Sequence, residues 1–291
     1  MTDGMAYRQI GVVGSGRVAR ALALGLGAHS AAPPLLYGRS PAGRDAAVAQ
    51  VARATAVARY DILAEACDLI VIAVSDDAIE PVVAELCRAL PEGRSPFIFH
   101  VSGRSGVAIL EPLRARGAIT AAIHPVMTFT GDPSNEVSRM AGARFAVTGS
   151  SAEADARAGQ VVRLLGGVAI AISEGHRSLY HAALCHAANH LVTLLSGSSR
   201  ALAVAGVEEP RALLAPLVRA ALENSLAHGF AALSGPLLRG DSETIRNHLD
   251  ALDDYCPETL PAYRAMAIAT LDELERMGER EPVAGLRESL A

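Results

Sequence analysis

The sequence has 291 residues, of which 51% are apolar and 20% charged, and its formal net charge is −5. Such a chain can bury a large core in one large or two medium domains, while its acidic balance, lack of Trp and aromatic content of 4% argue against nucleic-acid binding. All 26 basic residues are Arg, which excludes pyridoxal-phosphate, Schiff-base and Walker-type chemistry, because each of these needs a Lys amine.

The first predicted strand runs into a glycine-rich turn. Apolar residues 10–13 precede Gly14-x-Gly16-x-x-Ala19, and a helical pattern then continues to about Ala28. Gly14 permits the sharp turn, Gly16 lets the backbone approach an anion, and the free N–H groups of the helix face a diphosphate. An accidental glycine-rich turn is the alternative, and the flanking strands argue against it. We expect cofactor contacts from Gly14, Ser15, Gly16, Arg17 and Val18.

The second predicted strand, residues 34–37, indicates which dinucleotide is bound. In proteins that prefer NAD, an Asp or Glu at the end of this strand binds the ribose hydroxyls. Here the strand is followed by Gly38 and then by Arg39, Ser40 and Arg44, whose side chains suit a 2′-phosphate. Surface arginines in solvent are the alternative. The sequence therefore predicts NADP as the cofactor.

Three further predicted strands end in residues suited to a ligand site. They are 68–74, 96–101 and 118–123. Their carboxyl ends carry Val74-Ser75, Ser102-Gly103 and His124-Pro125, which should line one crevice because ligands bind at this edge of an open α/β sheet. We expect Val74, Ser75 and Ser102 to contact the cofactor. Residues 144–148 and 168–172 are predicted to be the last strands of this domain.

After Ser173 the pattern becomes helical, over about 174–205, 211–233, 242–252 and 257–277. The predicted fold class is therefore α/β, with an N-terminal Rossmann-like domain of mostly parallel sheet and an all-α C-terminal domain. We place the NADP-binding domain at 1–172 and a helical substrate and dimerisation domain at 173–291.

The first long helix of the second half is predicted to carry the chemistry. At 100° per residue, its polar side chains fall within a stripe of roughly 80°; they are Ser178, His181, Cys185, Asn189 and Ser196. His181 is the candidate proton donor and Asn189 would orient the substrate, with a buried, hydrogen-bonded histidine as the alternative. His124 and Ser102 are further catalytic candidates. We expect substrate contacts from Cys185, Ser234 and Arg239, unless Arg239 only pairs with Asp241 in a structural turn.

Two other histidines on this helix raise the possibility of a metal site. His186 and His190 are four residues apart and so share one helix face. No Glu follows His186, as a zinc protease would require, and two ligands are a partial set. We therefore expect no metal, and we assign these histidines to packing or to a partner subunit.

Several motifs carry a family resemblance: Phe99-His100-Val101-Ser102-Gly103, His124-Pro125-Val126-Met127-Thr128-Phe129, Leu179-Tyr180-His181-Ala182-Ala183 and Leu233 to Asp241. The chain resembles an uncharacterised bacterial family that joins a Rossmann-like domain to a C-terminal helical domain of unknown function. That family lies within the superfamily of 6-phosphogluconate dehydrogenase, pyrroline-5-carboxylate reductase and ketopantoate reductase. Several of these relatives place a catalytic Lys and an Asn on the first long helix, where this chain has His181, Cys185 and Asn189. The resemblance implies a homodimer that acts on a small-molecule substrate.

Three functions are open on this basis. The first is an NADP(H)-dependent oxidoreductase that transfers a hydride to a small C=O or C=N substrate of the keto acid or imine class. The second is a non-catalytic NADP-binding sensor or scaffold. The third is an enzyme similar to prephenate dehydrogenase, which Asn189-His190-Leu191 faintly resembles, although a Pro and a second His are absent.

The sequence also predicts a compartment. Apolar runs are far shorter than the ~18 residues of a membrane span, and no signal sequence opens the chain, so we expect a cytoplasmic protein with no membrane partner. Its four cysteines are widely spaced, which predicts reduced thiols and not a zinc ribbon or disulfide framework.

Overall fold

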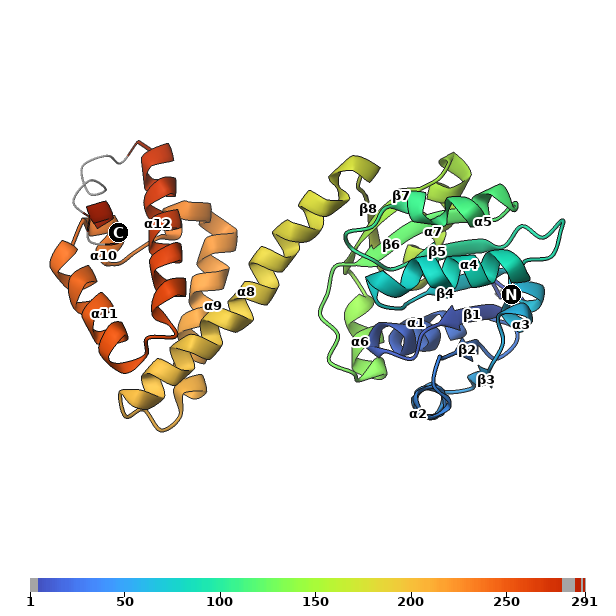
Figure 1. Cartoon of the computed structure of the whole chain (residues 1–291), viewed down its shortest axis with the longest axis horizontal. Coiled ribbons are helices and arrows are strands. Elements are labelled where there is room, and N and C mark those ends of the chain that lie inside the picture. Colours follow the sequence, from blue (N-terminus) through green and yellow to red (C-terminus); the bar gives the residue numbers. More distant parts are fainter. Residues whose placement is uncertain (1–4, 279–285, 289, 291) are drawn as a thin grey trace. The chain divides into compact units, whose positions relative to one another are not determined.

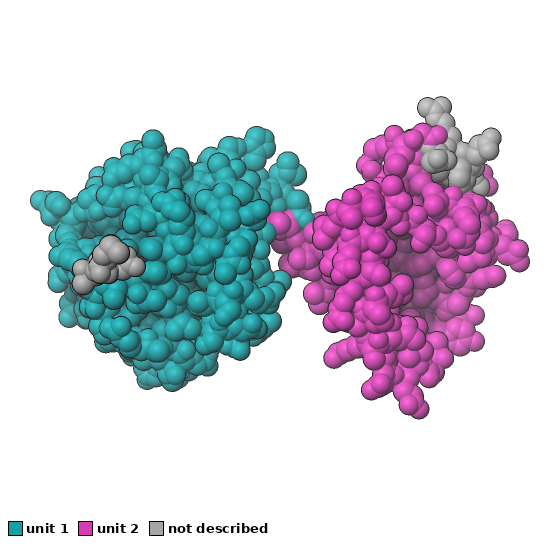
Figure 2. Space-filling view, turned by 180° about the vertical axis from the view of Figure 1, so that it is seen from behind, with its two compact units in different colours: residues 1–183 teal, residues 184–291 magenta. Residues whose placement is uncertain are grey.

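The structure, a computed structural model, describes residues 5–278, 286–288 and 290. Its contacts divide the chain into two compact units, residues 1–183 and 184–291, which Figure 2 shows in different colours. The dividing point lies inside a long helix, α8 (Arg177–Val204). The predicted boundary at 172/173 lies before this helix and stays a prediction about which part of the chain performs which task.

The first unit is built on one eight-stranded sheet in the order β3-β2-β1-β4-β5-β6-β7-β8. All neighbouring strands are parallel except β6 and β7, which are antiparallel, so the predicted mostly parallel sheet is confirmed. The strands are β1 (Ile10–Val13), β2 (Leu35–Tyr37), β3 (Thr55–Val57), β4 (Leu69–Ile72), β5 (Phe97–His100), β6 (Ile119–Pro125), β7 (Arg144–Gly149) and β8 (Val168–Ala171).

Helices cover both faces of this sheet (Figure 1). They are α1 (Arg17–Gly27), α2 (Pro41–Gln50), α3 (Tyr60–Ala66), α4 (Ile79–Ala89), α5 (Glu111–Ala115), α6 (Pro133–Met140) and α7 (Ala152–Leu164), with short 3-10 turns η1 (Asp76–Ala78), η2 (Val107–Leu110) and η3 (Glu174–His176). Alternate strand residues point to opposite faces: Val12 packs in the cluster that includes α1 and α7, and Val13 in the cluster that includes α3 and α4. Because both faces are buried, the central strands are apolar throughout.

The central strands bring their carboxyl ends to one edge. Val13 is in register with Tyr37 of β2 and Ile72 of β4, and Ile72 is in register with His100 of β5. Strand order reverses at β1, where the chain crosses from β3 over to β4. In open α/β sheets this reversal marks the ligand-binding crevice. The loops that follow β1, β2, β4, β5 and β6 are therefore neighbours.

The structure adds elements that the sequence patterns did not indicate. Strand β3 is an edge strand of three residues, and Thr55 and Ala56 are exposed, so it has no apolar run. Helix α2 begins at Pro41 with Ser40 as its N-cap, which places Arg44 in a helix and not in a loop. Helix α6 is likewise capped by Asp132 with Pro133 at its start.

The second unit is helical, which confirms the predicted all-α half. Besides the rest of α8, its described elements are α9 (Pro210–His228), η4 (Gly229–Ala232), α10 (Pro236–Arg239), α11 (Ser242–Tyr255) and α12 (Leu260–Arg276). Its core is a small apolar cluster that includes Ile245 of α11 and Leu271 of α12. Among the described helices of the whole chain, none is long and apolar enough to cross a membrane.

Candidate functional site

The turn between β1 and α1 has the geometry of a diphosphate cradle. Gly14 has a φ of +135°, and a Cβ on it would lie 2.2 Å from the carbonyl oxygen of Ala73, so only glycine fits there. Gly16 is the N-cap of α1, without a side-chain cap, and a Cβ on it would have no atom within 4 Å. The first N–H groups of α1 therefore face open space, where an anion can bind them.

The residues that follow the carboxyl end of β2 place hydroxyl and guanidinium groups near this turn. Ser40 accepts a hydrogen bond from the backbone N–H of Gly43 at 3.1 Å. A Cβ on Gly43 would lie 2.7 Å from Oγ of Ser40 and 3.4 Å from Oγ of Ser15, so both hydroxyls lie close to the first turn of α2. Arg39 is exposed, whereas the Arg44 side chain is mostly buried. Arg39 is thus the more accessible of the two candidate phosphate ligands.

The end of β4 lies beside this group. The hydroxyl of Ser75 donates to the carboxylate of Asp77, and this bond lowers the pKa of Asp77, with a smaller contribution from the positive charge of Arg39. Val74 packs at the edge of the core that includes β4 and α4. The predicted cofactor residues that follow β1, β2 and β4 are therefore brought to one edge of the sheet.

The loop after β5 is held rigid by a buried histidine. Nδ1 of His100 accepts from the backbone N–H of Ser102 at 3.1 Å, so its Nε2–H donates to the carbonyl of Gly106 at 2.8 Å. Burial lowers the pKa of His100 to about 4, so the ring is neutral at neutral pH. The loop is also tied to the end of β4 by an ion pair between Arg104 and Asp76 at 2.7 Å.

This histidine predicts a pH dependence of stability. The pKa of His100 is about 4 in the folded protein against an ordinary value of 6.5, so the unfolded chain binds more protons between these values. Its stabilising contribution is complete above pH 6.5 and is lost as the pH falls toward 4. The variant His100→Gln, which can keep one acceptor and one donor, should show a shallower loss of stability over this range. Urea unfolding of both proteins at several pH values measures the free energy of unfolding. An equal dependence of this free energy on pH in both proteins would contradict the contribution assigned to His100.

Gly103, in the same loop, borders a cluster of three aromatic side chains. Nδ1 of His124, on β6, shares a hydrogen bond of 2.8 Å with the hydroxyl of Tyr180, on α8. The rings of His124 and His181 are perpendicular, with centroids 6.0 Å apart. A Cβ on Gly103 would lie 2.5 Å from Cδ2 of His181 and 3.1 Å from Nε2 of His124, so only glycine lets both rings approach. We call Gly103, His124, Tyr180 and His181 the proton-donor cluster.

Two rings of the cluster, those of His124 and Tyr180, are uncharged at physiological pH. Burial lowers the pKa of His124 to about 4, with further lowering by the nearby charges of Arg177 and His181. Burial also raises the pKa of Tyr180 to about 12. The hydrogen bond between them therefore joins a neutral imidazole to a neutral phenol, so this buried pair carries no net charge.

Only part of this cluster could be predicted from the sequence. The sequence indicates His181, His124 and Ser102 as catalytic candidates and places Gly103 at the crevice, but it indicates no role for Tyr180 or Arg177. Position alone points to two of these residues, because Tyr180 directly precedes His181 and Gly103 directly follows Ser102. Ser102 itself is buried, and its hydroxyl accepts from the backbone N–H of Ser105 at 3.0 Å, so it supports the loop.

The other predicted site residues belong to the second unit. Asn189 is exposed and Cys185 half-buried on α8. Ser234 borders a groove of about 570 Å³ formed by α9 and η4. Arg239 ends α10, and Asp241 accepts hydrogen bonds from the backbone and hydroxyl of Thr244, so the carboxylate serves as a helix cap.

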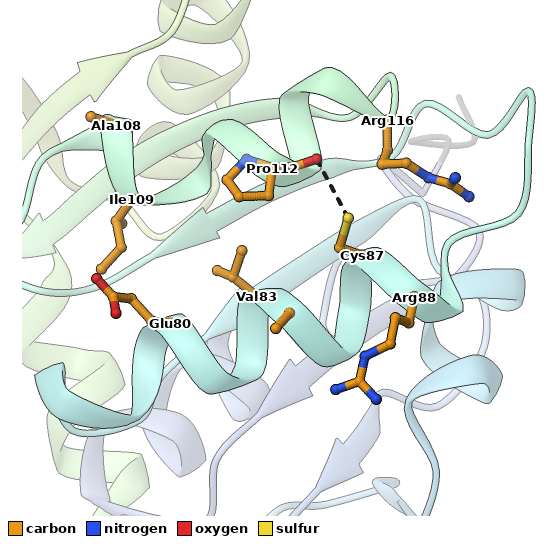
Figure 3. A pocket seen from close by; sticks show the side chains of 9 residues that line it. Glu80, Val83, Cys87, Arg88, Ala108, Ile109, Pro112 and Arg116 are labelled. Atoms are coloured by element: carbon orange, nitrogen blue, oxygen red, sulfur yellow. Dashed lines mark hydrogen bonds between the residues drawn. The ribbon is translucent and has the colours of Figure 1, made fainter.

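Two features elsewhere in the described chain lie outside the candidate site. His186 and His190 are exposed, and their Nδ1 atoms lie 3.0 Å apart, so they bond to each other. A groove of about 780 Å³ lies between α4 and the η2–α5 segment (Figure 3). Its middle is apolar, and Cys87 donates from Sγ to the carbonyl of Pro112 at 3.6 Å. It contains none of the predicted site residues.

Two protein-family models match the chain. A Rossmann-like domain matches residues 4–125, and a domain of unknown function, DUF2520, matches residues 143–270. Together the two matches cover most of the chain. Within the proton-donor cluster, Gly103 and His124 belong to the Rossmann-like match, whereas Tyr180 and His181 belong to the DUF2520 match. The cluster therefore draws on both matched segments, although all of it lies in the first compact unit.

Solved structures share this fold. A protein from Bacteroides fragilis provisionally described as an NADP oxidoreductase is 19% identical, with a TM-score of 0.75 over 90% of this chain and 97% of that chain. A reductive aminase from Aspergillus terreus, in complex with NADPH and ethyl-5-oxohexanoate, is 19% identical, with a TM-score of 0.68 over 97% of this chain and 99% of that one.

A third solved structure also shares this fold. A pyrroline carboxylate reductase from Plasmodium falciparum, with NADP bound, is 15% identical, with a TM-score of 0.60 over 99% of this chain and 98% of that one. At these identities the likenesses establish the fold. No curated protein matches the chain.

Proposed function

We propose that the chain is an NADP(H)-dependent oxidoreductase that transfers a hydride to a small C=O or C=N substrate of the keto acid or imine class. The observation that carries this proposal is the placement, within one compact unit, of a diphosphate cradle at β1 and a proton-donor cluster at the ends of β5 and β6. Fold relatives crystallised with NADP or NADPH support it.

The cradle residues fit the cofactor. The N–H groups that follow Gly16 would bind the diphosphate, and Arg39, Ser40 and Arg44 would bind the 2′-phosphate. Val74, Ser75 and the loop from Ser102 continue along the same edge. When bound, NADPH supplies the hydride, and the chain supplies position and a proton.

The proton-donor cluster completes the reaction. Hydride addition to a carbonyl or imine carbon leaves an oxygen or nitrogen that must take up a proton. We assign its delivery to His181, with the hydroxyl of Tyr180, hydrogen-bonded to His124, beside it as a second donor group. Asn189 would orient the reacting oxygen or nitrogen, and Cys185, Ser234 and Arg239 would contact the rest of the substrate.

We also propose that the protein is a homodimer. Helices α8 and α9 carry large exposed apolar side chains, of which Leu226 is 79% exposed, Leu179 70% and Val192 69%. Exposed apolar surface of this extent is typical of an interface. Analytical ultracentrifugation tests this assignment, and a monomer at micromolar concentration would contradict it.

Cofactor choice gives the first functional prediction. Because no acid follows β2, we expect NADPH to bind at least ~10-fold tighter than NADH, a difference of about 1.4 kcal/mol. The variant Arg39→Ala should lose most of this preference, since it removes an exposed cation that is free to approach a 2′-phosphate. Calorimetry with both dinucleotides measures the effect.

A matched control is available on another helix. Arg88 of α4 is exposed and pairs with Glu85 at 2.6 Å, so Arg88→Ala removes an equal charge away from the cradle. This variant should keep the wild-type preference. Equal affinities of the wild-type protein for NADPH and NADH would show that the assignment of NADP is wrong.

A further inference from the structure

Arg177, at the start of α8, is a buried cation with an unusual set of partners. Its side chain is 1% exposed. Nε donates to the carbonyl of Ser105 at 3.1 Å, Nη2 donates to the carbonyl of Ser102 at 2.6 Å, and Nη1 donates to the hydroxyl of Thr148 at 3.1 Å and more weakly to the carbonyl of Ala146 at 3.5 Å. Among the described residues no carboxylate forms an ion pair with Arg177; burial lowers its pKa, and the charge of Glu174 acts on that pKa only as the smallest influence.

Burying a charge without a counter-charge costs free energy, which dipoles can only partly offset. An apolar residue of similar length would fill the same volume without that cost. A guanidinium nevertheless occupies this position, and its planar fork fixes the directions of several acceptors at once. This arrangement favours a role in geometry over a role in net stability.

The acceptors of Arg177 belong to two segments that border the proton-donor cluster. Ser102 and Ser105 flank Gly103 in the loop after β5, and Thr148 lies on β7, next to β6. Arg177 also precedes Tyr180 by one helical turn, and its Cζ lies 6.0 Å from the centre of the Tyr180 ring. One side chain thus sets the position of Gly103 relative to Tyr180.

We propose that Arg177 is a positioning residue that holds the proton-donor cluster in its working geometry. This inference rests on the proposed function, because it assigns a task to Arg177 in that reaction. Arg177 acts through Gly103, His124 and Tyr180, and it does not touch the reacting atoms itself.

The charges around His124 give a readout of Arg177 that needs no turnover. Burial is the main cause of the low pKa of His124, Arg177 is the next, and His181 and His100 lower it further. Asp76 acts in the opposite direction, and Tyr180 shares the hydrogen bond at Nδ1. Removal of the Arg177 charge should therefore raise the pKa of His124 toward its ordinary value.

Two substitutions separate charge from geometry. Arg177→Lys keeps the charge but cannot bond to both carbonyls of the loop after β5 and to the hydroxyl on β7 at the same time, so kcat should fall while the pKa of His124 stays low. Arg177→Met removes both, so kcat should fall and the pKa of His124 should rise. A displaced catalytic group can lower kcat by about 10- to 100-fold.

The measurements are histidine signals in NMR titrations, NADPH affinity by calorimetry, and kcat with its pH profile. NADPH affinity should change less than kcat in both variants, because Ser102 is the one proposed cofactor residue in the loop that Arg177 holds. Arg94→Met is the control: Arg94 is half-buried and donates to the carbonyl of Cys67 at 2.9 Å, at the opposite edge of the sheet. This control should lower the melting temperature without changing kcat or the pKa of His124.

A merely structural Arg177 would behave as Arg94 does in catalysis, with a lower melting temperature, a kcat close to that of the wild-type protein and an unchanged pH profile. That result would overturn the inference. The titration of His124 needs neither substrate nor turnover, so it tests the inference even if the proposed reaction is wrong. If Arg177→Met does not fold, Arg177→Lys decides: wild-type kcat in that variant contradicts the positioning role.

Discussion

The variant His181→Ala is expected to lose about 10²- to 10⁴-fold in kcat while NADPH affinity and melting temperature remain close to those of the wild-type protein. The reason is the geometry around Gly103, where the imidazoles of His124 and His181 meet because no Cβ separates them. Removing the His181 imidazole leaves the substrate oxygen or nitrogen without its proton donor after hydride has added to the carbon. Steady-state kinetics on a substrate identified with the wild-type enzyme measures the loss.

A matched control lies five residues along the same helix. His186 is exposed and bonds to His190, so His186→Ala removes an imidazole from α8 outside the proton-donor cluster. It should keep wild-type kcat. If His181→Ala also keeps wild-type kcat, with folding and NADPH binding intact, His181 is not the donor, and His124 becomes the candidate.

Gly16→Ala is expected to weaken NADPH binding by about 10- to 100-fold, equivalent to about 1.4–2.7 kcal/mol, without lowering the melting temperature. The added methyl group meets no atom of the chain within 4 Å, and the backbone of Gly16, with φ of −73°, suits any residue. The methyl group would nevertheless stand where the diphosphate approaches α1. Calorimetry and thermal unfolding of the same preparation give both quantities.

Gly14→Ala and Gly93→Ala provide the comparison. At Gly14 the new methyl group overlaps the carbonyl oxygen of Ala73, so both stability and NADPH binding should fall. Gly93 also has a positive φ but has no neighbour within 4 Å of a Cβ, so it reports the cost of backbone strain alone. If Gly16→Ala binds NADPH as the wild-type protein does, the diphosphate does not bind at this turn.

The turn at the start of α1 could be predicted because its requirements are local. Gly14, Gly16 and Ala19 lie within one strand-turn-helix segment, and the spacing of glycines follows from that geometry alone. The central strands were predictable for a similar reason, since burial on both faces makes each an unbroken apolar run. Edge strand β3 could not be predicted, because Thr55 and Ala56 are exposed and need no apolar pattern.

The proton-donor cluster could be predicted only in part because its contacts are distant in sequence. His124 and Tyr180 are 56 residues apart, and nothing in either segment specifies the hydrogen bond between them. The role of Gly103 depends on two rings that approach it from β6 and α8. Arg177 was missed because arginine is usually exposed, and its burial follows from tertiary packing of the loop after β5 against β7.

The roles proposed for the second unit rest on the helical stripe and not on contacts. Asn189 and Cys185 follow His181 at helical spacing on α8, and this spacing still favours one polar line. Their function, like that of Ser234 and Arg239, stays a prediction, which alanine variants of each residue would test against an identified substrate.

NADPH oxidation by the purified protein, measured with a panel of cyclic imines, keto acids and aldehydes, decides whether the chain is a reductase. We expect substrate-dependent oxidation with at least one class, together with loss of this activity in His181→Ala but not in His186→Ala. Tight NADPH binding without oxidation by any member of the panel would contradict it, and would favour a non-catalytic NADP-binding sensor or scaffold.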